Sequence, residues 1–270
     1  MAEGPYLAEL HSRALISVSG PDWRPFLQGL LSQDVETLAP GELRFGALLT
    51  PQGRLLFDLF IEGAQDGCRL DVAAQSREAL IERLGLYRLR AKVDIASVED
   101  PVLALWPQEA PLAGWMRDPR LPALGLRGYG ASPPAGAKKV PEASYEAMRI
   151  GLGVTGAADY PPESAYPIEA NFDLLHGIDF QKGCFVGQET TSRMKRRGQV
   201  KSRMLALAVD GPPPPFGSEV LAGALRAGES RSAAPGRAMA LVRLDRIESE
   251  DLTLSGRPAR ALRPAYFEEN

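Results

Sequence analysis

Short runs of hydrophobic residues, separated by turn-forming residues, predict strands along the first hundred positions of the chain. Five runs are expected to be strands: 13–19, 43–49, 54–61, 68–73 and 91–98. The turn sequences TPQG at 50–53 and QDG at 65–67 separate the second, third and fourth of these runs, which is typical of hairpins. Three strands joined in succession by such turns predict an antiparallel meander.

Two helices are expected beside these strands. An apolar helix is predicted at about 23–31, and a second helix is predicted over 77–89. In the second helix Leu80, Leu84 and Tyr87 fall on one face, which indicates packing against a sheet. Ser76 directly precedes this helix and is a favourable N-cap residue.

The middle of the chain carries weaker signals. Residues 107–140 are rich in proline and glycine and predict loops, and a helical segment is expected at 145–150. The following GLGVTG at 151–156 matches the spacing GxGxxG, but a dinucleotide site requires a strand before the glycines and a helix after them. Because a helical segment precedes them and prolines follow at 161–162, we interpret 151–156 as a loop.

The sequence pattern of the last seventy residues is typical of a small β-domain. Four prolines at 212–215 exclude a helix interior or a central strand there. Short apolar segments follow at 218–225, 238–244 and 252–254, which favours a small barrel or sandwich. We therefore predict an α+β fold in two domains, 1–200 and 201–270.

Composition narrows the class of protein. The 270 residues are 44% hydrophobic and 24% charged, and the net charge of −3 excludes a generally basic nucleic-acid-binding surface. Cys68 and Cys184 are the two cysteines, so a disulfide-rich secreted scaffold is not expected. No apolar run approaches the roughly 18 residues that span a bilayer. The prediction is a soluble, cytoplasmic globular protein with no nucleic-acid or membrane partner.

Two kinds of motif are missing from the sequence, which limits the metal and nucleotide chemistry expected of it. The chain has two histidines, His11 and His176, and no CxxC or HExxH spacing. Structural zinc sites and Cys-ligated iron–sulfur clusters each need about four ligands, so no stably bound metal is expected from one subunit. There is also no GxxxxGK[ST] loop for ATP.

A basic segment stands out in this slightly acidic protein. Residues 181–203, QKGCFVGQETTSRMKRRGQVKSR, contain seven basic residues and one acid, Glu189, so their net charge is +6. Such a cluster attracts anions, either the glutamate tail of a ligand or an acidic partner surface. A solvated basic helix face is the alternative interpretation.

Cys184 lies at the start of this segment and is a candidate functional thiol. Lys182 and the start of a helix at Gln188 would favour the thiolate. Glu189, and burial suggested by the apolar residues at 185–186, would oppose it. Gly183 and Gly187 are consistent with tight turns or close approach to a ligand. An inert small hydrophobic role remains the alternative for Cys184.

Asp58 is a second candidate. It lies among apolar residues of the run 54–61, where a buried carboxylate needs a partner or a ligand nitrogen to offset its desolvation. The alternative is a strand residue that faces solvent. His176 is interpreted as a histidine at a helix end without a companion ligand.

At this point the residues resemble a known family. KGCFVGQE at 182–189 closely resembles the signature of the YgfZ family of folate-binding proteins implicated in iron–sulfur cluster assembly. Further segments resemble that family in the same order along the chain: 26–35, 48–61, 87–95, 145–154, 166–180 and 232–246. The resemblance therefore spans nearly the whole chain.

The resemblance also implies kinship with the aminomethyltransferase (T-protein) of the glycine cleavage system. That relative binds tetrahydrofolate in a central funnel, so residues 1–200 would form two interleaved folate-binding subdomains and residues 201–270 a β-barrel. It lacks a KGCxxGQE cysteine. The implied tetrahydrofolate-binding residues are Asp58, Arg90, Glu169, Lys182, Gly183, Gly187, Gln188, Glu189 and Arg193. Asp58 and Cys184 are the implied chemically active residues.

This chain departs from the T-protein pattern at the residue expected to bind the pterin ring. The T-protein pattern Arg-x-Glu-Ala-Gly corresponds to Arg149-Ile150-Gly151-Leu152-Gly153, so glycine replaces the expected acid at position 151. Glu169 is the candidate to replace that acid.

The resemblance implies three functions. The first is a non-enzymatic accessory factor that binds folate and assembles, transfers or repairs [4Fe-4S] clusters with client or carrier proteins, Cys184 acting as a thiol or transient metal ligand. The second is a tetrahydrofolate-dependent aminomethyl or one-carbon transferase. The third is a plain folate-binding or interaction module.

Overall fold

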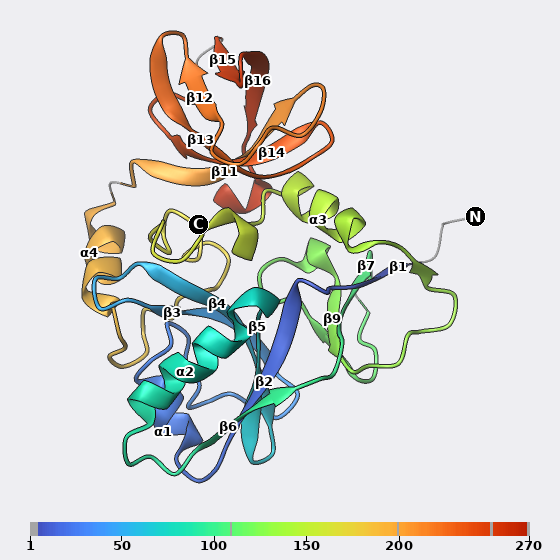
Figure 1. Cartoon of the computed structure of the whole chain (residues 1–270), viewed down its shortest axis with the longest axis vertical. Coiled ribbons are helices and arrows are strands. Elements are labelled where there is room, and N and C mark those ends of the chain that lie inside the picture. The colour runs from blue at the N-terminus through green and yellow to red at the C-terminus, as the bar shows by residue number, and fades with distance from the viewer. Residues whose placement is uncertain (1–4, 109, 199, 249–250, 269–270) are drawn as a thin grey trace.

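The computed structural model describes residues 5–108, 110–198, 200–248 and 251–268. Two five-stranded sheets and a closed six-stranded barrel are joined by irregular chain. Figure 1 shows the barrel at one end of the molecule, with helix α3 and the irregular segment 152–187 between the barrel and the sheets.

The first sheet contains the predicted meander. Its strands are β2 (Arg13–Ser19), β3 (Leu43–Leu49), β4 (Leu55–Ala64), β5 (Gly67–Ala73) and β6 (Asp94–Val98). Their order is β3-β4-β5-β2-β6, and all neighbours are antiparallel. The prediction of successive hairpins from 43 to 73 is confirmed.

Helices α1 (Trp23–Gln28) and α2 (Arg77–Arg88) pack on this sheet through Leu27, Leu80 and Leu84. The helix α1 ends earlier than predicted. Ser76 occupies the predicted N-cap position of α2, but it ends a 3-10 turn and its side chain makes no capping hydrogen bond.

The second sheet contains strands that the sequence pattern did not indicate. They are β1 (Tyr6–Glu9), β7 (Val102–Trp106), β8 (Trp115–Arg117), β9 (Leu126–Tyr129) and β10 (Lys138–Lys139), in the order β10-β1-β7-β9-β8. Residues 107–140 are mostly irregular, as predicted, but three of these short strands also lie there. Each has only two to four residues, too few to show an alternating pattern.

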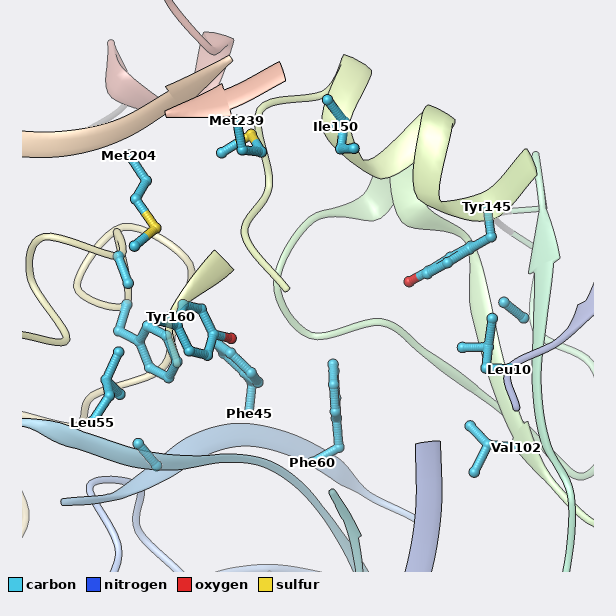
Figure 2. Packing of buried hydrophobic residues seen from close by; sticks show 14 of the residues in the cluster. Leu10, Phe45, Leu55, Phe60, Val102, Tyr145, Ile150, Tyr160, Met204 and Met239 are labelled. Atoms are coloured by element: carbon cyan, nitrogen blue, oxygen red, sulfur yellow. The ribbon is translucent and has the colours of Figure 1, made fainter. Parts of the chain in front are cut away.

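Helix α3 (Glu142–Gly151) begins before the predicted 145–150, and α4 (Gln188–Arg197) begins at the expected Gln188. The chain between them has little regular structure but carries much of the central core. Phe172 packs on Phe45 with ring centroids 4.6 Å apart. Figure 2 shows Phe45 from β3, Tyr160 from the irregular segment and Met204 from the barrel meeting in this core.

The C-terminal strands close into the expected small barrel. They are β11 (Ser202–Val209), β12 (Glu219–Ala222), β13 (Leu225–Ala234), β14 (Arg237–Arg243), β15 (Leu252–Leu254) and β16 (Arg257–Leu262). Their order is β11-β14-β13-β12-β15-β16. Residues 249–250 and 269–270 of the predicted C-terminal domain lie outside the described residues.

Asn171 connects the barrel to the irregular segment 152–187 through side-chain hydrogen bonds. Its side-chain amide donates to the carbonyl of Met204 on β11 at 2.7 Å, and its Oδ1 accepts from Arg203 at 3.2 Å. Asn171 is fully buried and has φ = 63°, a left-handed conformation that asparagine tolerates better than most residues.

We predict that Asn171→Ala lowers the free energy of unfolding by about 2–4 kcal/mol, because it leaves a buried carbonyl unpaired and places alanine at positive φ. Urea denaturation measures this loss. Gln65→Ala in an exposed turn is the control and should change stability by less than about 0.5 kcal/mol. A loss of that small size in Asn171→Ala would contradict this connecting role.

Candidate functional site

A cavity of about 490 Å³ lies between the first sheet, the second sheet and helix α3. Its wall includes Arg13 from β2, Asp58 and Phe60 from β4, and Tyr145 and Glu146 from α3. In Figure 2 Tyr145 and Phe60 point into the same space from α3 and β4. This volume is in the range of small-molecule sites.

Asp71 on β5 is the centre of the buried charges beside the cavity. It is fully buried and accepts hydrogen bonds from Arg13 Nε at 2.6 Å, Arg127 Nη1 at 2.7 Å and Tyr129 Oη at 3.1 Å. Arg13 also donates to both oxygens of Asp58, at 3.1 and 2.9 Å. Burial alone would lower the pKa of Arg13, but Asp58 and Asp71 raise it above its ordinary value.

A second buried pair, Arg120 and Asp118, also lies close to Phe60, with Arg120 Cζ 4.7 Å from the ring centroid. Arg120 donates to both oxygens of Asp118, at 3.0 and 2.7 Å, and to the Tyr145 hydroxyl at 3.0 Å. Burial by itself raises the pKa of Asp118, yet Arg120 brings it below its ordinary value. Arg127 stacks on Phe60, its Cζ 3.8 Å from the ring centroid.

Arg149 ties α3 to both the cavity wall and the barrel. It donates to Asp159 at 2.8 Å and to Ser232 on β13 at 3.1 Å. It also donates to both oxygens of Glu146, the shortest contact being 2.6 Å. Although burial raises the pKa of Glu146, Arg149 lowers it below the ordinary value, so Glu146 lines the cavity as a carboxylate.

A smaller cavity of about 130 Å³ adjoins the first, and both are lined by Asp58. Tyr160 lines this smaller cavity. Its buried hydroxyl has no hydrogen-bond partner among the described residues, and burial raises its pKa well above the ordinary value. An unpaired buried hydroxyl costs about 1–3 kcal/mol, so a bound molecule would stabilise this site.

Asp58 therefore faces the cavity, and the solvent-facing alternative is wrong: the residue is 3% exposed. Its neighbours on β4 explain this, because that strand is buried on both faces. Glu146 is the functional candidate that the sequence reasoning missed. Its spacing of three residues from Arg149 on a helix was the available signal.

Three other residues implied by the resemblance do not reach this cavity. Arg90 is exposed beyond the end of α2. Glu169 accepts a hydrogen bond from the backbone of Tyr166, and burial raises its pKa, but it does not line the cavity. A side chain at Gly151 would meet Arg237 of the barrel at 2.4 Å, so position 151 faces the barrel.

Cys184 lies on an exposed loop, and no residue of 181–189 lines the cavity. Lys182 was expected to support a thiolate at Cys184, but in the structure its ammonium group binds backbone carbonyls. Lys182 Nζ donates to the carbonyls of Gln28 and Leu31, both at 2.6 Å. Burial lowers its pKa to about 8. Lys182 thus anchors the loop to the segment after α1, and sequence spacing could not show that direction.

The two glycines beside Cys184 have different roles. Gly187 has φ = +82°, and a Cβ there would come within 2.6 Å of the Thr50 carbonyl in the β3–β4 turn. The start of α4 therefore packs directly on that turn. Gly183 has open space around its Cα, so no close approach explains it.

The remaining candidates, Gln188, Glu189 and Arg193, lie on α4. Gln188 is half-buried, whereas Glu189 and Arg193 are exposed and form an i,i+4 pair at 3.7 Å. The structure thus separates the predicted site into a cavity with Asp58 and an exposed surface with Cys184. Among the described residues, no group of three or more His, Cys, Asp or Glu side chains could hold a metal ion.

Comparisons with known proteins identify relatives of the whole chain. Residues 201–269 match the family model described as CAF17, C-terminal beta-barrel domain. A Pyricularia oryzae protein named iron-sulfur cluster assembly factor IBA57 homolog, mitochondrial, is 33% identical over 94% of this chain and 75% of its own length. The Mycosarcoma maydis homologue is 35% identical over 77% of this chain, which spans 59% of that relative. The human protein of that name is 30% identical over 77% of this chain and 67% of its own length.

A solved structure confirms the predicted fold class. The glycine cleavage system aminomethyltransferase T from Bartonella henselae superposes with a TM-score of 0.76, covering 98% of this chain and 86% of the other. The two sequences are 17% identical, so the likeness concerns the fold. The prediction of an α+β aminomethyltransferase-like fold with a C-terminal barrel is confirmed.

The predicted cytoplasmic location is wrong by the same comparisons, because these relatives are named as mitochondrial proteins. Balanced charge and few cysteines are compatible with either compartment, so they could not decide between them. In the described part of the chain, no helix is long and apolar enough to cross a membrane.

We predict that Cys184 reacts with a maleimide at least about tenfold faster than Cys68 at neutral pH in the folded protein. Cys184 is exposed, whereas Cys68 is 2% exposed and burial raises its pKa to about 12. Mass spectrometry of partially labelled protein measures both rates, and labelling in urea is the control that should equalise them. Equal rates without urea would contradict this assignment.

Proposed function

Because this chain belongs to the family of the IBA57 iron–sulfur cluster assembly factors, we propose that it is a folate-binding accessory factor in the assembly, transfer or repair of [4Fe-4S] clusters. The clusters are its cargo. Its partners would be client or carrier proteins that receive or deliver them. The KGCFVGQE segment favours a finer kinship with the bacterial YgfZ proteins within this family.

The observation that carries the folate proposal is the cavity of about 490 Å³, whose wall combines carboxylates and arginines with the aromatic rings of Phe60 and Tyr145. A folate has an aromatic pterin with N–H donors along one edge. Phe60 and Tyr145 offer aromatic faces, and Asp58 and Glu146 offer acceptors. The unpaired hydroxyl of Tyr160 in the adjoining cavity is a further group that a ligand would satisfy. The residues present therefore fit tetrahydrofolate.

Gly151 does not weaken this proposal. Position 151 faces Arg237, so an acid there would lie outside the cavity wall. Glu146, on the same helix, supplies an ionised carboxylate at the wall. We therefore replace Glu169 with Glu146 as the candidate that meets the donor edge of the pterin.

Cys184 supports the cluster-related part of the proposal. Its thiol is exposed on a loop fixed by Lys182 and by the buried ring of Phe185. An accessible thiolate on an anchored loop can ligate a metal that a partner also holds. Cys184 would thus be a transient ligand shared with a partner.

The arrangement of Asp58 favours an accessory role over the alternative one-carbon transferase. Both carboxylate oxygens of Asp58 are held by Arg13 within 3.1 Å. A carboxylate whose two oxygens both accept from a guanidinium is fixed in place, which suits holding a ligand better than approaching a reacting atom. Assay of methylene transfer to tetrahydrofolate separates the two functions, and turnover that Asp58→Asn abolishes would favour the transferase.

We predict that Glu146→Gln weakens tetrahydrofolate binding by about tenfold or more, because one charge-assisted hydrogen bond is lost. Isothermal titration calorimetry under anaerobic conditions measures the dissociation constant. Glu78→Gln on the exposed side of α2 is the matched control and should bind as the parent does. Absence of binding by the parent protein would refute the folate proposal itself.

We predict that Cys184→Ala keeps the fold but abolishes support of [4Fe-4S] enzymes in cells that lack the native protein, because the exposed thiol is lost. Gly183→Ala, beside it in open space, is the control and should restore activity. Thermal unfolding verifies that both variants are folded. Full activity with Cys184→Ala would remove the thiol from the proposed function.

A further inference from the structure

Two adjoining cavities, of about 260 and 320 Å³, form a groove along the side of the barrel. Leu244, which follows strand β14, lines both of them. We call the pair the barrel groove. It shares no lining residue with the cavity beside Asp58.

The floor of the barrel groove is apolar. Its hydrophobic residues come from the irregular segment, the barrel and the C-terminal turn: Leu174, Leu205, Leu244, Ile247 and Phe267. Leu244 and Phe267 are half-buried, whereas Leu174, Leu205 and Ile247 are buried. The cavity therefore offers an apolar lining that a side chain of another molecule can enter.

The rim of the groove is basic and continues into α4. Lys201, Arg203, Arg243 and Arg263 line its two parts. Lys195 on α4 and Arg203 in the groove both contact Asp173, at 3.8 and 2.9 Å. One buried carboxylate therefore couples the helix to the groove, and Figure 1 shows the chain running from α4 into β11.

The exposed cations on this surface exceed the acids available to them. Arg243 and Arg263 are paired with Asp245 and Glu248. In the described part of the chain, Arg196, Arg197 and Lys201 have no acidic partner within 4.0 Å. This leaves a positive surface in a protein whose net charge is −3.

Helix α4 also sets the separation between the groove and the thiol. It has ten residues, beginning four positions after Cys184 and ending just before the groove residues Val200 and Lys201. At 1.5 Å per residue the helix is about 15 Å long. A protein docked along α4 would therefore reach both the groove and the loop of Cys184.

We propose that the barrel groove and α4 form a docking surface for an acidic segment of a protein partner that carries apolar side chains. Carboxylates of the segment pair with Arg196, Arg197 and Lys201 while its apolar side chains enter the groove. The proposal rests on the proposed function for the role of the partner, which is to exchange a cluster at Cys184. The apolar floor favours a protein segment over a nucleic acid, whose backbone offers phosphates but no aliphatic groups.

The test uses the full-length protein and a short fluorescein-labelled peptide of alternating glutamate and leucine, followed by fluorescence anisotropy. The variant Arg196→Gln/Arg197→Gln/Lys201→Gln, called the α4 variant, should weaken binding by about tenfold, since each exposed charge pair contributes modestly. Leu244→Ser should weaken peptide binding, while the dependence of that binding on salt stays the same as in the parent protein. Raising the ionic strength from about 0.1 M to about 1 M shortens the Debye length from about 10 to about 3 Å and should also weaken binding.

Arg83→Gln/Arg88→Gln/Arg90→Gln, on the exposed side of α2 and just beyond its end, is the matched control, called the α2 variant, and should bind as the parent does. A peptide with serine in place of leucine should bind more weakly than the parent peptide. Equal losses in the α2 and α4 variants, or no binding by the parent protein, would overturn the proposal. A single-stranded oligonucleotide that binds more tightly, with the same loss in the α4 variant, would also overturn it in favour of a nucleic-acid site.

These outcomes are separable from those of the proposed function, because the peptide assay involves neither folate nor clusters. In cells, the α4 variant should reduce support of [4Fe-4S] enzymes while tetrahydrofolate binding by the purified variant stays unchanged. If the peptide binds as expected but the α4 variant supports these enzymes fully, the docking role is refuted and the folate proposal stands.

Discussion

One buried carboxylate, Asp71, determines how the two sheets meet. It accepts from Arg13 on β2 of its own sheet and from Arg127 on β9 of the other, at 2.6 and 2.7 Å. Removing one member of such a buried group leaves an uncompensated charge, at a cost of about 3–5 kcal/mol. The ion pairs therefore hold the sheets at a fixed separation, and Arg13 extends the same network to Asp58. The cavity beside them follows from this arrangement, because guanidinium groups occupy space that a hydrophobic contact would close.

The β3–β4 hairpin connects the cavity with the distant thiol surface. Its second strand carries Asp58 into the cavity, and its turn at 50–53 packs on Gly187 at the start of α4. The carbonyl of Thr50 would lie 2.6 Å from a Cβ at position 187, so only glycine permits this contact. The cavity wall at Asp58 and the loop of Cys184 are thus joined through one element of structure. Lys182 fixes the other side of the loop on the carbonyls of Gln28 and Leu31.

The parts of the fold that local pattern could predict are those in which one element repeats over several residues. The hairpins from 43 to 73, helix α2 and the start of α4 are of this kind. Strands β8, β9 and β10 were not predicted, because each forms by pairing with a neighbouring strand and is too short to show a hydrophobic pattern of its own. Glu146 was not predicted for a related reason: α3 carries two acids, Glu142 and Glu146, and only the packing of α3 against the sheets brings them to the cavity wall.

The sequence by itself determined the α+β class, a small C-terminal β-domain and the basic character of α4, and it left the orientation of Asp58 open. The first three follow from residue type and short-range spacing, which act through burial and backbone conformation. The tertiary structure alone decided which charges meet. Arg13, Asp71 and Arg127 are separated by up to 114 positions in sequence, and Lys182 donates to the carbonyls of Gln28 and Leu31, which are 154 and 151 positions away. An ion pair depends on distances of a few ångströms in space, and chain separation does not fix those distances until the sheets, helices and barrel have packed.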